Sequence, residues 1–375
     1  MLKLVGKPNT LKELNSSVIK QLIDEKGPLS KPQIAKLVGL SLPTVNKLVD
    51  DLEAQHCVRQ VGTAGEGAGR KAKLYETDRS SGCLVALYYR WGKYICRITD
   101  ITGQTLHEAV FPLDNSSLQT ACSSTIAAID DLIKKAPAEV KAIGVGVPGV
   151  MLPDGSLSGI PKIEVWEGYH LADMLEDRYQ VQIWVENDVK LAAVGYYYAN
   201  LEQKHDHLVY IYAGNGMGSG IILNRKLFRG GTNFAGELGF MAPLCAEFPK
   251  ESYVTKGGYL ESQMRQFVSS GCETFETPAD STQREALVTL LAGAAANYVA
   301  VINPDAIVFG GEAFDNRHIE DLLQAIYCQM SNYIVKESMP QILYDSNSST
   351  GIEGLLSTCR AGINQRMQLV QAGGV

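Results

Sequence analysis

The chain has 375 residues, a formal net charge of −7 and 45% hydrophobic residues, values that are typical of a globular protein and unfavourable for disorder. This length predicts two or three domains with room for buried cores. We recognise no window of about 20 uncharged apolar residues and no secretory signal, so we expect neither a membrane span nor export. The eight cysteines are scattered without a Cys-x-x-Cys pair, which favours reduced thiols in a cytoplasmic protein.

The charge is divided unevenly along the chain. Residues 1–76 contain 12 Lys and Arg against 8 Asp and Glu, a balance of +4, whereas the remaining residues contain 22 against 33, a balance of −11. A basic head on an acidic body indicates that only the head meets a polyanion such as DNA. Chance variation in a short segment would give the same balance, so charge alone leaves this interpretation open.

The basic head has the pattern of three helices. Apolar residues recur at helical spacing over residues 14–23, and the pattern stops at Gly27 and Pro28. Ser30 is placed to cap a second helix, with Gln33 three residues after it, and Ser41 is placed to cap a third. A helix, a short glycine-containing turn and another helix are the parts of a helix-turn-helix.

Two short strands are expected after the third helix, over residues 57–61 and 73–75, on either side of a glycine-rich tip that forms a wing. In such a fold the start of the third helix enters the major groove, where Asn, Thr and Lys contact base edges. Other polar residues are placed to contact DNA phosphates. An arginine on the wing is placed to enter a narrow minor groove. The candidate DNA-binding residues are Gln33, Lys36, Ser41, Pro43, Thr44, Asn46, Lys47 and, on the wing, Arg70. A head that contacts only protein, and a merely solvated Arg70, stay open as alternatives.

From about residue 80, strands alternate with helices, which predicts an α/β body. We expect domains over residues 1–76 and 82–375, joined by a linker at residues 77–81. The expected strands are 83–87, 94–99, 142–147, 181–185, 207–212, 221–223 and 306–309, and the expected helices are 118–135, 189–199 and 282–301. A glycine loop from Gly214 to Gly220 precedes one of these strands, and we interpret it first as a hairpin turn, with a phosphate loop as the alternative.

Five short motifs of the body, in this order and spacing, resemble those of the ROK family of repressors and sugar kinases. They are Gly144–Gly149, Glu186–Asp188, Gly214–Gly218, Ala235–Gly239 and Phe309–Gly311. The resemblance covers the chain from about residue 80 onward, and the helix-turn-helix in front is similar to that of the repressor branch. It implies a winged helix-turn-helix joined to a two-lobed body of actin-like ATPase (ribonuclease H-like) fold, and assembly as a homodimer or tetramer.

The same motifs contain residue types that suit a sugar. Each sugar hydroxyl is both a donor and an acceptor, and carboxylates and amides recognise such groups in pairs. The resemblance places a sugar at Gly149, Asn187, Asp188, Glu237 and Glu261. Gly149 ends a buried strand, where the backbone can approach a ligand closely. For each acidic residue the alternative is a solvated or helix-capping carboxylate, most of all for Glu261.

One departure from the family pattern bears on catalysis. Family kinases hold ATP and its metal with Asp-x-Gly-x-Thr on the first hairpin, whereas this chain has Tyr88, Arg90 and Gly92 at those positions. In the second phosphate loop Asn215 stands where Thr is usual. Asp188 is then a vestigial base with no phosphate presented to it, and we expect no catalytic residue and no cofactor.

A second departure concerns zinc, which family members hold with a His and several cysteines. Phe240 replaces that His here, and the following stretch contains only Cys245. One cysteine cannot form a tetrahedral site, so we expect no metal. The family's His also contacts sugar, and Phe240 could instead offer a sugar an apolar ring face.

Together these features favour a cytoplasmic transcriptional repressor of carbohydrate genes. It would bind double-stranded operator DNA and respond to a sugar or sugar derivative held between the two lobes. Two alternatives stay open: an active ATP-dependent sugar kinase with an appended head, and a constitutive DNA-binding regulator whose pocket is vestigial. Residues 244–277 match the family pattern poorly and have no assigned role.

Overall fold

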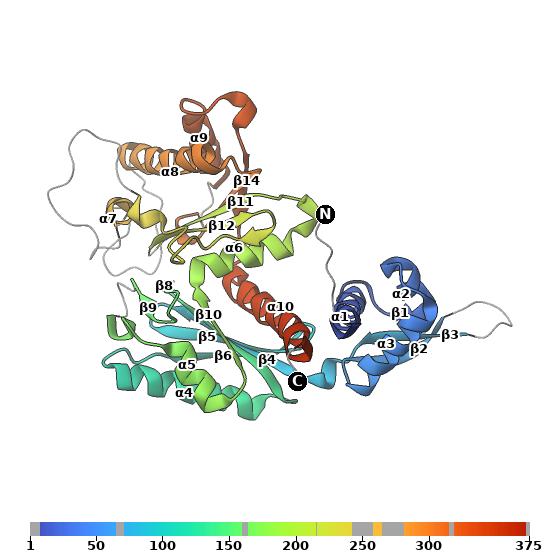
Figure 1. Ribbon diagram of the computed structural model, residues 1–375. Coiled ribbons are helices and arrows are strands. Elements are labelled where there is room, and N and C mark those ends of the chain that lie inside the picture. The colour runs from blue at the N-terminus through green and yellow to red at the C-terminus, as the bar shows by residue number, and fades with distance from the viewer. Residues whose placement is uncertain are drawn as a thin grey trace.

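The computed structural model describes residues 8–64, 71–159, 164–214, 216–241, 258–264, 281–314 and 319–372. A head of three helices and a small sheet precedes a body built on two larger sheets (Figure 1). The elements of the head are α1 (Pro8–Lys26), β1 (Leu29–Ser30), α2 (Lys31–Val38), α3 (Leu42–Ala54), β2 (Val58–Ala64) and β3 (Ala72–Thr77). The three expected helices and both wing strands are confirmed, and β1 joins them as an additional strand in the order β1-β3-β2.

Capping side chains fix the turns of the head. The side-chain oxygen of Gln33 accepts hydrogen bonds from the N–H and hydroxyl of Ser30, at 2.9 and 2.7 Å. The hydroxyl of Ser41 accepts one from the N–H of Thr44 at 3.4 Å, at the start of α3. Gly39 ends α2 with a φ of 72°, a left-handed conformation that glycine adopts without strain. Both caps that the sequence predicts are therefore present.

The first body sheet has the order β10-β7-β4-β5-β6. Its strands are β4 (Cys83–Arg90), β5 (Lys93–Asp100), β6 (Thr105–Pro112), β7 (Val140–Val147) and β10 (Gln182–Asn187). The first three are antiparallel, whereas β7 and β10 run parallel to β4. Its outer face packs against α4 (Leu118–Lys135) and α5 (Leu171–Tyr179) through a shared apolar cluster. The sequence analysis did not anticipate β6 or α5.

The second body sheet repeats this topology in the order β13-β12-β11-β14-β15. Its strands are β11 (Leu208–Ala213), β12 (Met217–Leu223), β13 (Lys226–Leu227), β14 (Ala306–Gly310) and β15 (Gln341–Asp345), and its outer helices are α8 (Ser281–Ile302) and α9 (Ile319–Met330). Again three antiparallel strands are followed by two that run parallel to the first. Two sheets of the same order confirm the two-lobed actin-like, ribonuclease H-like body.

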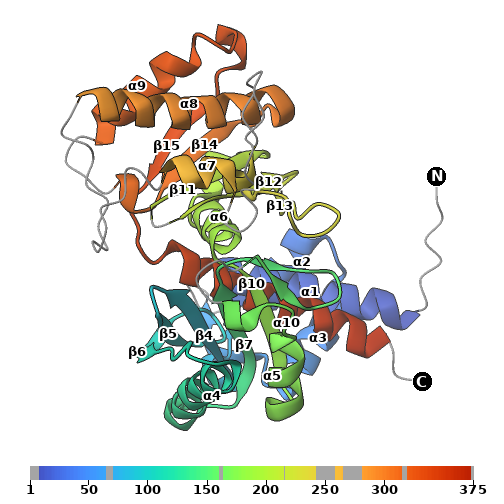
Figure 2. The same cartoon turned by 90° about the vertical axis from the view of Figure 1, so that its left-hand side faces the viewer.

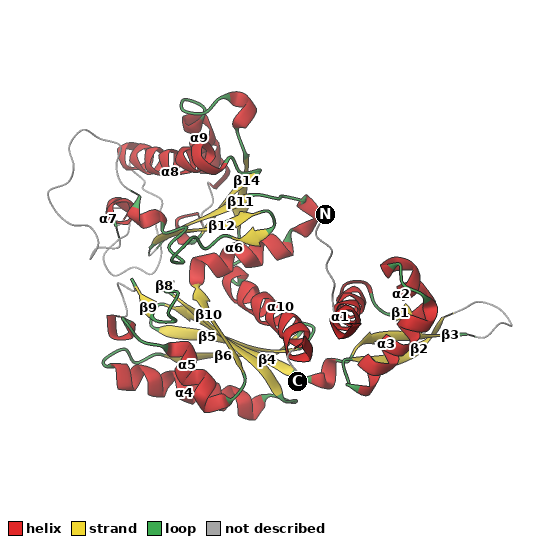
Figure 3. Cartoon of the chain, in the orientation of Figure 1, coloured by secondary structure: helices red, strands yellow, loops and turns green. Residues whose placement is uncertain are grey.

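Two helices lie between the sheets, as Figures 2 and 3 show: α6 (Asp188–Ala199) and α10 (Thr350–Ala372). Helix α10 packs on the first sheet, and α6 packs on the second. The two helices touch backbone to backbone, because a Cβ on Gly354 would lie only 1.9 Å from the carbonyl oxygen of Leu191. A Cβ on Gly195 would likewise lie 2.0 Å from the carbonyl oxygen of Thr350. Only glycine permits so close an approach.

Helix α10 also reaches the head. Its N-terminal end lies inside the body, and α1 of the head packs against it (Figures 1 and 2). The Arg79 side chain, which follows the wing sheet, donates a hydrogen bond to Gln104 in the turn between β5 and β6. The head is therefore held by contacts with the body as well as by the chain connection.

The remaining described elements are short. They are β8 (Val150–Met151), β9 (Leu157–Ser158), α7 (Tyr259–Met264) and the 3-10 helices Arg79–Ser81, Glu164–Trp166, Leu201–Gln203, Leu238–Phe240, Glu312–Phe314 and Lys336–Ser338.

The glycine loop expected over residues 214–220 is largely a strand, which corrects that expectation. Strand β12 begins at Met217, which pairs with Ala213 across a tight hairpin. A Cβ on Gly220 would lie 2.3 Å from the Cβ of Ala193, so this glycine lets α6 pack closely on the sheet. Asn215 lies outside the described residues.

The expectation that the chain has no membrane-length apolar stretch also needs correction. Residues Arg284–Ile302 of α8 are long and apolar enough to cross a membrane by length and composition alone. Their Leu287, Leu291 and Ala295 are fully buried in the cluster that α8 shares with the second sheet. This is the packing of a core helix in a globular fold.

The helix crossing gives a direct test of this packing. Gly354→Ala should lower the free energy of unfolding by about 2–4 kcal/mol, because the added methyl group meets the backbone of α6. Gly293→Ala in α8 is the matched control, since its Cβ would meet no atom within 4 Å, and it should be neutral or stabilising by up to about 1 kcal/mol. Urea unfolding followed by circular dichroism measures both. Equal effects of the two substitutions would contradict the crossing.

Candidate functional site

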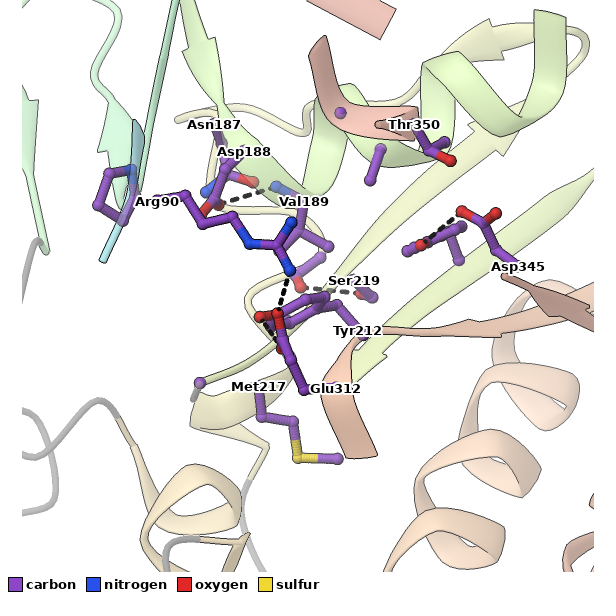
Figure 4. Close-up of a pocket in the computed structure, with 18 of the residues that line it drawn as sticks. Arg90, Asn187, Asp188, Val189, Tyr212, Met217, Ser219, Glu312, Asp345 and Thr350 are labelled. Atoms are coloured by element: carbon purple, nitrogen blue, oxygen red, sulfur yellow. Dashed lines mark hydrogen bonds and ion pairs between the residues drawn. The ribbon is translucent and has the colours of Figure 1, made fainter. Parts of the chain in front are cut away.

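A cleft of about 240 Å³ lies between the two body sheets. It is lined by Gly149, Asn187, Asp188, Glu237 and Glu261, the five residues that the sequence predicts for a sugar. Figure 4 shows this region, with Asn187 and Asp188 on one side. The structure therefore brings together five residues that the sequence spreads over more than one hundred positions.

Asn187 ends β10 and caps α6. Its side-chain oxygen accepts a hydrogen bond from the N–H of Lys190 at 2.9 Å, and its amide nitrogen donates one to the carbonyl oxygen of Gly149 at the same distance. Gly149 has a φ of 103°, which favours glycine. Asn187 thus ties the start of α6 to the turn after β7, and both of its polar atoms are engaged in positioning this edge of the cleft.

Asp188 is the first residue of α6, and its carboxylate accepts a hydrogen bond from the N–H of Val189 at 2.8 Å. The N-terminal end of a helix stabilises negative charge, because its N–H groups point outward and the helix dipole is positive there. This arrangement favours an ionised, half-buried carboxylate at the cleft wall, able to accept hydrogen bonds from a ligand's hydroxyl groups.

Glu237 faces a buried cation on α6. The carboxylate of Glu237 lies 3.8 Å from the ammonium of Lys190, whose side chain is only 1% exposed and also donates to the carbonyl oxygen of Asn233. Burial raises the pKa of Glu237, and the Lys190 charge opposes this rise. Burial lowers the pKa of Lys190, and Glu237 opposes that shift. Lys190 therefore helps to keep Glu237 charged.

Glu261 and Phe240 form the other wall of this half of the cleft. Glu261, on α7, accepts a hydrogen bond from the N–H of Met217 at 3.3 Å. The negative charge of Glu261 also raises the pKa of Glu237, after the larger effect of burial. The ring of Phe240 lies 5.2 Å from that of Phe234, and Phe240 lines the cleft. An aromatic face beside carboxylates suits the apolar and polar sides of a sugar ring.

The far half of the cleft is crossed by an ion pair between the lobes. Arg90 of β4 contacts Glu312 of the second lobe at 2.9 Å, as Figure 4 shows. The hydroxyl of Tyr212 donates to the other carboxylate oxygen of Glu312 at 2.5 Å. The hydroxyl of Tyr88 donates to the backbone oxygen of Asp188 at 3.2 Å. Two of the three positions that the resemblance assigns to ATP phosphates thus hold large side chains: Tyr88 bonds the backbone of Asp188, and Arg90 pairs with Glu312 across the cleft.

The start of α10 completes this half of the cleft. Thr350 and Gly351 line it, and a Cβ on Gly351 would lie 2.3 Å from the Tyr88 ring. Asp345, at the end of β15, accepts a hydrogen bond from the hydroxyl of Tyr210 at 2.9 Å. The first turns of both central helices, α6 and α10, therefore border the cleft.

The head presents the predicted DNA-binding side chains on one surface. Pro43, Thr44, Asn46 and Lys47 are exposed on α3, while its buried face consists of Val45, Leu48, Val49 and Leu52. Gln33, Lys36 and Ser41 are exposed on the neighbouring turn and helix, although the caps described above occupy the side-chain oxygens of Gln33 and Ser41. Arg70 lies outside the described residues.

Sequence reasoning missed Lys190 and Glu312. A lone lysine within the apolar run of α6 is a signal for a buried, paired cation, because a free charge is rarely fully buried. No local pattern indicates Glu312, whose partner Arg90 is 222 positions away. Among the residues that the structure describes, no group of three or more His, Cys, Asp or Glu is placed to share a metal ion. Cys245 lies outside them.

The buried pair predicts a pH-dependent stability. Lys190→Met should lower the free energy of unfolding by about 3–5 kcal/mol at pH 7, because it leaves Glu237 buried without a countercharge. Loss of the lysine raises the pKa of Glu237 further, so the folded variant takes up a proton before the unfolded chain does. The deficit relative to the wild type should therefore shrink as the pH falls from 7 to 5.

Urea unfolding at several pH values measures this deficit. The double variant Lys190→Met/Glu237→Gln is the matched control, because it has no carboxylate left to titrate and should show a deficit that changes little with pH. A deficit in Lys190→Met that does not depend on pH would show that Lys190 does not act through the charge of Glu237.

Comparison with known proteins agrees with both parts of the fold. Residues 92–252 match the ROK family, and residues 18–59 match a winged helix-turn-helix DNA-binding family. The DNA-binding transcriptional dual regulator NagC of Escherichia coli is 30% identical over 241 residues, which are 63% of this chain and 59% of that protein. The xylose repressor of Bacillus subtilis is 24% identical over 62% of this chain and 61% of its own length. The chain thus spans about three fifths of these curated relatives.

Solved structures show the same fold. A ROK family transcriptional regulator, described as a homologue of the Escherichia coli MLC protein, superposes with a TM-score of 0.75 over 96% of this chain and 99% of its own, at 16% identity. A ROK hexokinase from Thermus thermophilus superposes with a TM-score of 0.60 over 76% of this chain and 99% of its own, at 19% identity. The chain therefore matches the ROK family over residues 92–252 and a winged helix-turn-helix family over residues 18–59, and its fold is that of the ROK structures.

Proposed function

We propose that this chain is a cytoplasmic transcriptional repressor of carbohydrate genes that responds to a sugar or sugar derivative bound between its lobes. The observation that carries the proposal is that one helix, α10, contacts both the cleft and the head. Its first turn lines the cleft and its length packs against α1 of the DNA-binding head. The named repressors among the relatives support the same conclusion.

The head supplies the DNA-binding surface of the proposal. The exposed first turns of α3 would enter the major groove, with Asn46 donating to and accepting from adenine, Thr44 touching a thymine methyl and Lys47 reaching guanine or phosphate. Two such heads in a homodimer or tetramer would match half-sites about 34 Å apart, one turn of DNA. Arg70, between the two wing strands in the sequence, would add a minor-groove contact.

The body supplies the sensor. Asp188, Glu237 and Glu261 would accept hydrogen bonds from sugar hydroxyls, Gly149 would offer its backbone, and Asn187 would hold that backbone in place. A ligand that favours one lobe arrangement shifts α10 and with it the head. A 100-fold change in operator affinity requires a coupling free energy of only about 2.7 kcal/mol.

The far half of the cleft supports a sensor without kinase activity. Phosphoryl transfer depends on groups that position and neutralise the phosphates of ATP. The residues here are Tyr88, Arg90 and Glu312, which bond each other or the backbone across the space that such phosphates need. The chain would bind neither ATP nor a metal in this half. Asp188 would therefore have no phosphoryl transfer to assist.

The experiment for the sensor separates DNA binding from sugar response. An operator is first selected from random DNA with the purified protein, and sugars are screened for stabilisation of the fold. Asp188→Asn should bind this operator as tightly as the wild type, yet a sugar that releases the wild type should no longer release the variant. Asp173→Asn on the exposed surface of α5 is the control and should behave as wild type. Equal release of both variants would contradict the assignment of Asp188.

The experiment for the head uses one substitution on α3. Asn46→Ala should weaken binding to the selected operator by about 10-fold or more, because a two-bond contact to a base contributes about 1–3 kcal/mol. Binding to unrelated DNA should change little, since that binding depends on phosphates. Gln55→Ala, exposed at the other end of α3, is the control. Fluorescence anisotropy at fixed salt measures both, and equal affinities would place the reading surface elsewhere.

A further inference from the structure

The lining of the cleft is strongly acidic. Among its described residues the charged side chains are Asp188, Glu237, Glu261, Glu312, Asp345 and Arg90, which are five carboxylates and one guanidinium. Arg90 comes from β4 of the first lobe, Asp188 begins α6, and the other four carboxylates come from the second lobe. A small cleft with low-dielectric walls strengthens the field of such a set.

Arg90, the cation of this described set, is already engaged by three neighbours. One terminal nitrogen of Arg90 contacts Glu312 at 2.9 Å, and the other donates to the backbone oxygen of Ser348 at 3.4 Å. Its guanidinium also stacks on the ring of Trp91, with 4.4 Å between guanidinium carbon and ring centre. A new anion would therefore compete with Glu312 for this group.

Two other features that attract anions are also occupied. The ammonium of Lys190 lies behind Glu237 at 1% exposure, contacts that carboxylate and the backbone of Asn233, and does not line the cleft. The N-terminal end of α6, which favours negative charge, is capped by Asn187 and carries the carboxylate of Asp188.

The buried phenols of the far half experience the same field. Burial, and then the negative charge and hydrogen bond of Glu312, raise the pKa of Tyr212 well above its usual value. Burial and then the charge of Asp345 do the same to the pKa of Tyr210. Burial is the larger cause for both phenols, and the neighbouring carboxylates add to it.

We propose that the cleft takes an unphosphorylated sugar, neutral or carrying an amino group, and that Glu312 excludes phosphorylated sugars by occupying Arg90. A sugar phosphate carries about −1.5 to −2 charges at pH 7 and would meet the five carboxylates with no free cation among the described lining residues. Hydroxyl and ammonium groups, in contrast, donate hydrogen bonds, which carboxylates accept. This inference rests on the proposed function and specifies its ligand class.

The test compares matched ligand pairs on the full-length protein. The probes are glucose, mannose and N-acetylglucosamine, each beside its 6-phosphate, with binding measured by calorimetry and by thermal shift in low and physiological salt. We expect at least one neutral sugar to bind on the order of 30-fold more tightly than its phosphate. The ratio of the sugar affinity to the phosphate affinity should be larger at low salt, because the repulsion between the phosphate and the carboxylates is then less screened.

A charge-neutral variant tests the role of Glu312. Glu312→Gln keeps the shape of the side chain and releases Arg90, so the affinity for the 6-phosphate should rise and the ratio should fall by about 10-fold. The double variant Arg90→Gln/Glu312→Gln should lose that gain, because the freed cation is gone. Glu139→Gln, an exposed carboxylate on the body surface, is the control and should keep the wild-type ratio.

The outcomes separate this inference from the proposed function. A 6-phosphate that binds as tightly as its sugar, or more tightly, overturns the inference while the sugar-sensing repressor stands. An unchanged ratio in Glu312→Gln overturns the role of Glu312. If neither member of any pair binds at any salt concentration, while the operator is still bound, the sensor itself is refuted and the ligand class with it.

Discussion

The architecture of the body depends on the contact between α6 and α10. Gly195 and Gly354 let the two helix backbones touch, and this contact sets the spacing of the two sheets on which the helices pack. Both helices begin at the cleft, with Asp188 at the start of one and Thr350 at the start of the other. A side chain at the crossing would therefore change the distance between the cleft walls as well as the stability of the fold.

Buried charge shapes the cleft in two different ways. In the half that holds Glu237, the buried Lys190 fixes a carboxylate that still faces the ligand space. In the other half, Glu312 and Arg90 satisfy each other across the lobes. Removing one partner of the buried Lys190–Glu237 pair costs far more than the pair contributes, so that half is held in one arrangement. The first pair prepares a binding surface, and the second closes off the space beside it.

Local pattern accounts for much of the fold but not for the far half of the cleft. Helix α4 begins and ends where the sequence predicts, because its cap and apolar spacing are local signals. Asp188 and Glu237 were placed by motifs, and the structure brings them to one cleft. The Arg90–Glu312 pair could not be predicted, since 222 residues separate its partners. The glycine loop does form a hairpin, but most of it is strand β12, where Gly220 lets α6 pack closely on the sheet.

The packing of α1 against α10 limits how this protein can evolve. A DNA-reading unit on a free tether can be exchanged between proteins whatever domain it is joined to. Here the first described helix and the last described helix share an interface, so a new head must also suit the surface of α10. Conversely, in the repressor that we propose, a substitution on that surface would alter regulation while every residue proposed to touch DNA or ligand stays the same. The interface thus couples the evolution of α1 to that of α10, at opposite ends of the described chain.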